Sequence, residues 1–248
     1  PVLPAQVNKT FVSSTNAGIT LSGTNVLVAP GTPAGPYTLT YQICEVLNTS
    51  NCDQATVSIT VTAAPIVAND DTAAPINGYV GGTAYTNVLS NDTLNGAPAI
   101  PAQVNTTFVS STNAGVTLSG TDVIVAPGTL AGSYTLTYQI CEVLNPNNCD
   151  TAVVTVSVGS ATIVANDDNG TPVNGYEGGT AFTNVLANDT LNGVAVVASE
   201  VTTTFVSSTN PGVTLSGTNV VVAPGTPAGN SLNQEYLKSR AAISMETL

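Results

Sequence analysis

Apolar and polar residues alternate over short stretches of this chain, which is the pattern of half-buried β-strands. Residues 134–140 read YTLTYQI, with the aromatic and aliphatic residues on one face and threonine and glutamine on the other. Val154, Val156 and Val158 continue the alternation in a last strand. Residues 116–125, VTLSGTDVIV, place two alternating runs around a polar turn and predict a β-hairpin. No segment inside the repeated sequence has the 3.6-residue period of a helix, so the pattern predicts all-β domains.

The pattern repeats every 97 residues. The segment FVSSTN begins at positions 11, 108 and 205, and 47 of the 64 residues of 1–64 are identical in 98–161. A period of this length is too long for a solenoid coil and matches one β-sandwich. We therefore predict tandem immunoglobulin-like β-sandwich domains of about seven or eight strands each, without the tryptophan of antibody domains.

The repeat predicts the domain boundaries. Residues 65–161 form a complete repeat, 1–64 the C-terminal part of another, and 162–229 the N-terminal part of a third. From residue 230 the sequence NSLNQEYLKSRAAISMETL is foreign to the repeats. Its Leu232, Tyr236 and Ile243 would share one face of a short helix, and a vector-derived or misread terminus is an equal alternative for 230–248.

Charge is scarce and of one sign. The 248 residues include 15 Asp or Glu, 3 Lys or Arg and no histidine, for a net charge of −12. Nucleic-acid binding is excluded because it needs a basic surface, and histidine-based nucleophilic or zinc catalysis has no residue to use. With 42% hydrophobic residues the chain is too apolar for disorder. We expect a folded, non-enzymatic protein with a neutral polar surface and no membrane insertion.

Four cysteines recur at the repeat spacing. Cys44 and Cys52 lie in CEVLNTSNC, and Cys141 and Cys149 lie in CEVLNPNNC. The first cysteine of each pair ends one strand and the second opens the next, so a disulfide would close the neck of a hairpin. The nine-residue ring is worth about 2.5 kcal/mol by loop entropy. Disulfides of this kind place the protein outside the cytosol.

The carboxylates concentrate in VANDD and in the NDT turn of each repeat. Calcium prefers such oxygen ligands, so no cofactor is required but Ca²⁺ is a candidate, and the alternative is that these residues form Asx-turns at strand ends. The candidate metal residues are Asp70, Asp71, Asp92, Asp167, Asp168 and Asp189. A glycosidase pair is a poor interpretation, because the tyrosines at 41 and 138 alternate with aliphatic residues as core positions do and leave no sugar platform.

Taken together, VANDD, NVLxNDTLNG and the Cys-bracketed YQIC…NCD…VTV ending resemble the tandem immunoglobulin-like or cadherin-like repeats of long Bacteroidetes cell-surface adhesins. The resemblance covers residues 1–229 and implies an extracellular stalk or filament. It also implies O-glycosylation where Asp-Thr precedes an aliphatic residue, with plain turn chemistry as the alternative. The candidate acceptors are Thr72, Thr93, Thr151 and Thr190.

Two functions follow from these observations. The first is a structural repeat array that forms a stalk or fibre of a bacterial surface protein. The alternative is a module that binds glycans or a host surface through its loops. The expected partners are neighbouring repeats, and the two partial domains would also allow head-to-tail assembly of copies through strand complementation.

Overall fold

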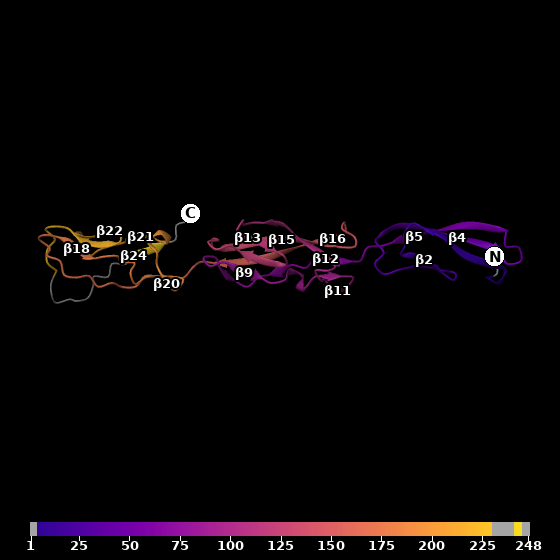
Figure 1. Ribbon diagram of the computed structural model, residues 1–248. Helices are drawn as coiled ribbons and strands as arrows, with labels where there is room; N and C mark the ends of the chain where they lie inside the picture. Colours follow the sequence, from indigo (N-terminus) through magenta and orange to yellow (C-terminus); the bar gives the residue numbers. More distant parts are fainter. Residues whose placement is uncertain (1–3, 230–240, 245–248) are drawn as a thin grey trace. The chain divides into compact units, whose positions relative to one another are not determined.

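The computed structural model describes residues 4–229 and 241–244, and strands dominate them. No α-helix occurs among these residues, and the helical content is three single turns of 3-10 helix, η1 (Pro4–Gln6), η2 (Val88–Ser90) and η3 (Ala198–Glu200). The described chain divides into two compact units, residues 1–76 with 81–158, and residues 77–80 with the chain from Gly159 onward. The all-β prediction is confirmed (Figure 1).

The middle repeat contains eleven strands between residues 65 and 161. They are β6 (Ile66–Val67), β7 (Asp71–Thr72), β8 (Ile76–Asn77), β9 (Gly82–Tyr85), β10 (Thr93–Leu94), β11 (Ala97–Pro98), β12 (Val104–Ser111), β13 (Val116–Ser119), β14 (Asp122–Val125), β15 (Gly132–Glu142) and β16 (Cys149–Gly159). Five of them are only two residues long, which is why there are more strands than the expected seven or eight.

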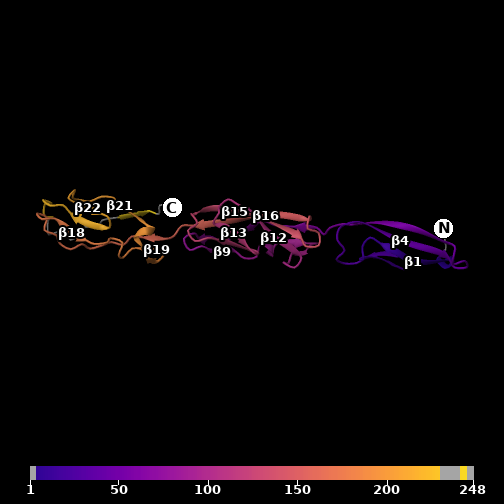
Figure 2. The same cartoon turned by 45° about the horizontal axis from the view of Figure 1, so that its top comes forward.

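These strands form the sheets of a sandwich. One sheet has the order β12-β15-β16-β7, in which β7 runs parallel to β16, and a second has the order β13-β14-β9. A small third sheet has the order β11-β10-β6. Figure 2 shows the long strands from a second direction. The predicted hairpin at 116–125 is confirmed, with Val116 opposite Val125 and Ser119 opposite Asp122.

The alternation in β15 sorts its side chains as predicted. Leu136, Tyr138 and Ile140 are fully buried, while Thr137 and Gln139 between them are half-buried. Val154, Val156 and Val158 of β16 face the same core. All members of this core cluster lie between residues 66 and 158. Because a β-strand has a period of two residues, alternation alone fixed which face is buried.

The first repeat has strands β1 (Val7–Ser14), β2 (Ile19–Ser22), β3 (Asn25–Val28), β4 (Gly35–Glu45) and β5 (Cys52–Val61). Its sheet β1-β4-β5 repeats the order and register of β12-β15-β16, including the irregularity after Phe11 that recurs after Phe108. Its core is more open than that of the middle repeat. Val28 is 46% exposed, whereas the equivalent Val125 is fully buried.

The third repeat carries the complementary set of strands. They are β17 (Ile163–Val164), β18 (Gly179–Phe182), β19 (Thr190–Leu191), β20 (Val194–Ala195), β21 (Thr202–Phe205), β22 (Val213–Ser216) and β23 (Asn219–Val222), followed by β24 (Ala241–Ser244). Two of its sheets have the orders β17-β19-β20 and β18-β23-β22. Residues 241–244 pair as a strand with β21, so the helix expected around Ile243 is wrong there. The rest of the predicted helix, with Leu232 and Tyr236, lies outside the described residues.

Candidate functional site

Both cysteine pairs are disulfides at hairpin necks. Cys44 bonds to Cys52 and Cys141 to Cys149, with Cα atoms 4.1 Å apart in each pair. The two cysteines of a pair lie directly opposite each other where β4 meets β5, or β15 meets β16. The predicted pairing is therefore confirmed. Each bond closes a ring of nine residues and lowers the conformational entropy of the unfolded chain at the same position of the repeat.

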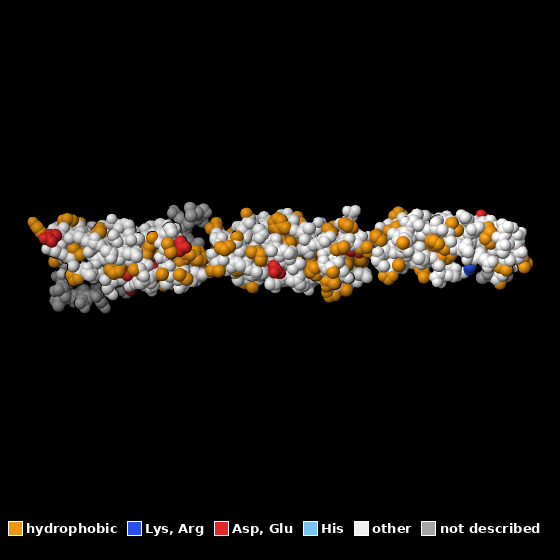
Figure 3. All heavy atoms as spheres, in the orientation of Figure 1, with side chains coloured by type: hydrophobic (Ala, Val, Ile, Leu, Met, Phe, Trp, Pro, Cys, Tyr) orange, Lys and Arg blue, Asp and Glu red, His pale blue; other side chains and the backbone are white. Residues whose placement is uncertain are grey.

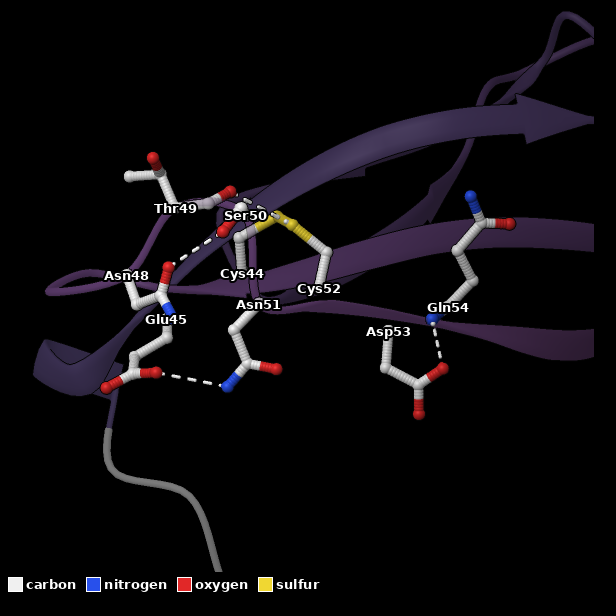
Figure 4. The surroundings of a disulfide bond; sticks show 9 residues. All are labelled: Cys44, Glu45, Asn48, Thr49, Ser50, Asn51, Cys52, Asp53 and Gln54. Atoms are coloured by element: carbon white, nitrogen blue, oxygen red, sulfur yellow. Dashed lines mark hydrogen bonds between the residues drawn. A yellow bond between two sulfur atoms is a disulfide. The ribbon is translucent and has the colours of Figure 1, made fainter.

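A side-chain hydrogen bond reinforces each disulfide loop. In the first repeat Asn51 donates from Nδ2 to Glu45 Oε2 at 3.0 Å (Figure 4). In the middle repeat Asn148 donates to Glu142 Oε2 at 2.8 Å and also to the Ala64 carbonyl at 2.7 Å. Glu142 is buried, with 5% of its surface exposed. The loop is thus held by covalent and polar contacts.

The middle repeat also encloses a cluster of two carboxyl groups and one phenol. Asp71 comes from β7, Asp92 follows η2, and Tyr138 points inward from β15, with exposed fractions of 4%, 1% and 0%. Tyr138 Oη lies 3.1 Å from Asp92 Oδ2 and 3.4 Å from Asp71 Oδ2. Backbone carbonyls of Asn69 and Val88 lie 3.2 and 3.1 Å from the same hydroxyl. We call this group the Asp-Tyr cluster.

The Asp-Tyr cluster has more acceptors than donors. A phenol donates one hydrogen, so it satisfies one of these oxygens at a time. Asp92 Oδ1 also accepts from the backbone N–H of Asn69 at 2.7 Å, but Asp71 Oδ1 accepts no hydrogen bond from the described residues. Burial raises the pKa of Asp71 and of Asp92, while neighbouring hydrogen-bond donors lower each pKa in part. Burial, followed by the two carboxylates, raises the pKa of Tyr138.

The six predicted metal residues are distributed over two repeats. The structure brings Asp71 and Asp92 together, whereas Asp70 Oδ1 accepts from the backbone N–H of Val153 at 2.8 Å. In residues 4–229 and 241–244, no three His, Cys, Asp or Glu side chains are grouped to hold a metal ion. The Tyr138 hydroxyl already lies among the oxygens of the Asp-Tyr cluster, so a calcium ion would have to enter beside it. Calcium binding stays a prediction.

The third repeat contains the acidic half of an equivalent cluster. Asp189 is 2% exposed and accepts from the backbone N–H of Asn166 at 2.7 Å, as Asp92 accepts from Asn69. Burial, and then Asp189 and Asp167, raise the pKa of the half-buried Asp168. At the repeat position of Tyr138 the sequence has Glu235, which lies outside the described residues.

The predicted glycosylation threonines differ in exposure. Thr72 and Thr151 are exposed, whereas Thr93 and Thr190 are half-buried next to the buried aspartates. The backbone N–H of Thr151 donates to Asp150 Oδ1 at 2.9 Å, a local contact within β16. Modification of these residues stays a prediction, and Thr72 and Thr151 are the two that an enzyme would reach first.

The sequence interpretation placed Tyr138 in the core but missed the link from its hydroxyl to Asp71 and Asp92. One signal was available. Buried tyrosine hydroxyls normally find a hydrogen-bond partner, so a tyrosine at a core position implies polar groups nearby. The spacing alone did not reveal which acidic residues would meet it, because they come from 46 and 67 residues upstream.

The exposed face drawn in Figure 3 agrees with the composition. Uncharged polar side chains and backbone cover most of it, with a few acidic and almost no basic side chains. Apolar side chains are scattered over the same face (Figure 3). The exposed apolar side chains of the described residues include Phe11 and Phe108, each about half exposed. Of the helices in the described residues, none is long and apolar enough to cross a membrane.

Comparison with known proteins gives structural neighbours but no family. No protein-family model matches the chain, and no curated protein matches it. The EC1-2 fragment of chicken VE-cadherin has a TM-score of 0.32 and 18% identity, over 64% of this chain and 86% of that one. The EC22-24 fragment of mouse cadherin-23 has a TM-score of 0.32 and 14% identity, over 90% and 76%.

An endo-fucoidan hydrolase of glycoside hydrolase family 107 has a TM-score of 0.26 and 14% identity. The match covers 63% of this chain and 24% of the hydrolase, so the chain spans about a quarter of that enzyme. Scores this low carry no functional argument. The class rests on the strands themselves, and this is a tandem β-sandwich repeat protein with a disulfide-closed hairpin in each of its first two repeats.

Proposed function

We propose that the chain is a non-catalytic structural array, part of a stalk or fibre of an extracellular bacterial surface protein. The observation that carries the proposal is the recurrence of the same strands at a fixed 97-residue spacing, with a disulfide-closed hairpin in the first and middle repeats. A domain with its own core and staple withstands load without help from its neighbours. The disulfides support a location outside the cytosol.

The chemistry of the chain supports a non-enzymatic role. It has no histidine, and all four cysteines are in disulfides. The buried carboxyl groups of the Asp-Tyr cluster are enclosed in the core, with exposed fractions of 4% or less. A catalytic acid-base pair must reach a substrate. This cluster has the properties of a structural element instead.

Surface labelling tests the location. Antibodies raised against the repeats are expected to label intact cells of the source organism on projecting structures. Labelling that appears only after the cells are permeabilised would contradict the proposal. A glycan array probed with the chain examines the alternative, and binding that is lost on substitution of loop residues would favour a recognition module over a stalk.

Force spectroscopy tests the mechanical role. When the chain is pulled from its ends, the segments between Cys44 and Cys52 and between Cys141 and Cys149 are expected to stay closed until a reductant is added. Reduction should therefore lengthen each unfolding step by a short, fixed increment. Unfolding at negligible force, or steps that reduction does not change, would argue against a load-bearing repeat.

Three finer proposals add to this role, of which the first follows from the resemblance to Bacteroidetes adhesins and the other two from the sequence itself. Thr72 and Thr151 carry O-glycans in the native source, which an intact mass equal to the unmodified 24.8 kDa would refute. Calcium stiffens the acidic segments, which an unchanged melting temperature on addition of EDTA would refute. Copies assemble head to tail through the open strands of the first and third repeats, and a strictly monomeric chain would refute this.

A further inference from the structure

The disulfide loop of the middle repeat contacts the first repeat at two backbone groups. Residues 1–76 and 81–158, which hold the first repeat and most of the middle repeat, form one compact unit. The side-chain oxygen of Asn145 accepts a hydrogen bond at 2.6 Å from the backbone N–H of Ala34, which lies between β3 and β4. Asn148 Nδ2 donates at 2.7 Å to the carbonyl of Ala64, which lies between β5 and β6.

The burial of the two asparagines agrees with this contact. Asn145 and Asn148 are half-buried, while the loop residues between them and directly before them are exposed. Asn48 and Asn51 occupy the same positions of the Cys44–Cys52 loop and are exposed. Since both loops are closed by a disulfide at the same point of the hairpin, the cover on the asparagines of the middle repeat comes from outside the loop.

The loop holds these side chains in a defined position. The Cys141–Cys149 bond joins its two ends, and the backbone N–H of Asn148 donates to the Asn145 carbonyl at 2.8 Å. Pro146 lies between the two asparagines and restricts the backbone further, because its ring fixes φ. Asn148 also donates to Glu142 Oε2 within the same loop. Little conformational entropy is therefore lost when the loop contacts the first repeat.

We propose that the Cys141–Cys149 loop is the docking surface that restrains the joint between the first and middle repeats. Its partner surface is the backbone of the β3–β4 loop and of the linker after β5. Domains joined by a linker move relative to each other unless a specific contact restrains them. The disulfide therefore stiffens the joint as well as its own hairpin. The proposal rests on the structural role given above and adds to it how consecutive domains are held to each other.

The residues of the joint recur along the chain. Asn48 and Asn51 lie at the repeat positions of Asn145 and Asn148, and Ala131 lies at the repeat position of Ala34. In a repeat array, each domain contributes its own stability and a contact with its nearest neighbour. The same loop can therefore supply the nearest-neighbour contact wherever one repeat of this kind follows another.

Amide hydrogen exchange in the full chain, followed by NMR at single residues, tests the contact. Asn145→Ala removes the acceptor of the Ala34 N–H, so exchange at Ala34 should accelerate at least about fivefold. The internal reference is the Thr32 N–H, which donates to a carbonyl of the same β3–β4 loop at 3.3 Å and should not change. Asn48→Ala is the matched control, because Asn48 Oδ1 accepts from Ser50 within its own loop at 2.8 Å (Figure 4).

A second set of variants tests whether the two contacts act as one joint. Asn148→Ala removes the contact to Ala64 and leaves the acceptor of the Ala34 N–H in place. Exchange at Ala34 should still accelerate about fivefold, because the loop leaves the first repeat more often. Replacing Cys141 and Cys149 with serine should accelerate it as well. A role confined to the hairpin would instead speed exchange in β15 and β16 and leave Ala34 unchanged.

Spin labels measure the stiffness of the joint directly. S58C and S157C place one label on an exposed position of β5 and one on an exposed position of β16, and the four native cysteines are already paired. Double electron–electron resonance should give a narrow distribution of distances between the two labels in this chain. The narrow peak should be lost when Asn145 and Asn148 are both replaced by alanine.

Each outcome decides for or against the joint. Unchanged exchange at Ala34 in Asn145→Ala, or equal acceleration in Asn48→Ala, overturns the contact. A broad distance distribution in the chain that keeps both asparagines, or a narrow one in the chain that lacks them, overturns the restraint. A failure here is distinct from a failure of the structural array, because surface labelling and force spectroscopy test that role independently.

Discussion

Replacing Tyr138 with phenylalanine is the sharpest test of how the middle repeat is held together. The ring stays, so the apolar burial of this fully buried side chain is nearly unchanged. Only the hydroxyl is lost, and with it the contacts to Asp92 at 3.1 Å and to Asp71 at 3.4 Å. A hydrogen bond to a charged group contributes about 1.5–3 kcal/mol. We expect Y138F to destabilise the middle repeat by about 2–3 kcal/mol for this reason.

The repeat supplies its own control. Tyr41 occupies the equivalent position in the first repeat, where the structure describes no acidic partner for its hydroxyl. Tyr41→Phe in the monomeric chain should therefore change stability by less than about 0.5 kcal/mol. Hydrogen exchange measured by mass spectrometry reports each hairpin separately, since CEVLNTSNC and CEVLNPNNC give peptides of different mass. Far faster exchange in β15 and β16 of Y138F is the expected result.

Two results would refute the reasoning. If Y138F and Y41F shift exchange equally, the hydroxyl has no special role in the middle repeat. If Y138F leaves exchange in β15 and β16 unchanged, the carboxyl groups satisfy themselves by holding a shared proton. Asp71→Asn separates these cases, because an amide supplies its own donor and should recover part of the stability lost in Y138F.

Three further predictions concern the same repeat. Burial raises the pKa of Asp71 and of Asp92 above the ordinary value of 3.8, so the folded state binds more protons than the unfolded state. The stability of the folded state should therefore fall as the pH rises through the raised pKa values. Asp71→Asn should flatten a plot of melting temperature against pH. Replacing Cys141 and Cys149 with serine should cost about 2.5 kcal/mol in denaturant unfolding, and no loss would show that the loop is closed without the bond. Gly81→Ala should destabilise the repeat more than Gly120→Ala in thermal melts, because both have positive φ but only a Cβ at Gly81 would lie 2.6 Å from the Val125 carbonyl oxygen; equal melting temperatures would contradict this.

Local patterns predicted most of the long strands and both disulfides. Alternation over the seven residues 134–140 of β15, and over the ten residues of the β13–β14 hairpin, predicted both the strands and their buried face. The turn at Asn95-Gly96 follows the same rule, since both residues adopt the positive φ that this dipeptide favours, at 54° and 75°. Strands and turns of this kind are encoded within a dozen residues, so sequence reasoning reaches them.

The short strands could not be predicted, because their partners are distant in sequence. β7 is two residues long and exists only through its pairing with β16, more than 80 residues later. β6 depends in the same way on β10. No periodicity can be seen in two residues. The Asp-Tyr cluster has the same cause, since it joins three segments that only the complete sandwich brings together.

Equivalent positions in the three repeats distinguish structure that depends on the local sequence from structure that depends on the surrounding strands. Asp71-Thr72 forms a strand where β16 is present, and Asp168-Asn169 does not in the third repeat, where the sequence departs from the repeat before a counterpart of β16. Val125 is fully buried and Val28 is 46% exposed, although they end equivalent hairpins in the middle and first repeats. The hairpin at 19–28 has nearly the same sequence as the one at 116–125, so the different exposure of Val28 and Val125 comes from the elements that cover them. At β7 the local sequence differs as well, because Asn169-Gly170 replaces Thr72-Ala73, and asparagine and glycine are depleted in strands. It follows that burial is set by the surrounding elements, whereas the loss of the β7 strand also reflects the local sequence.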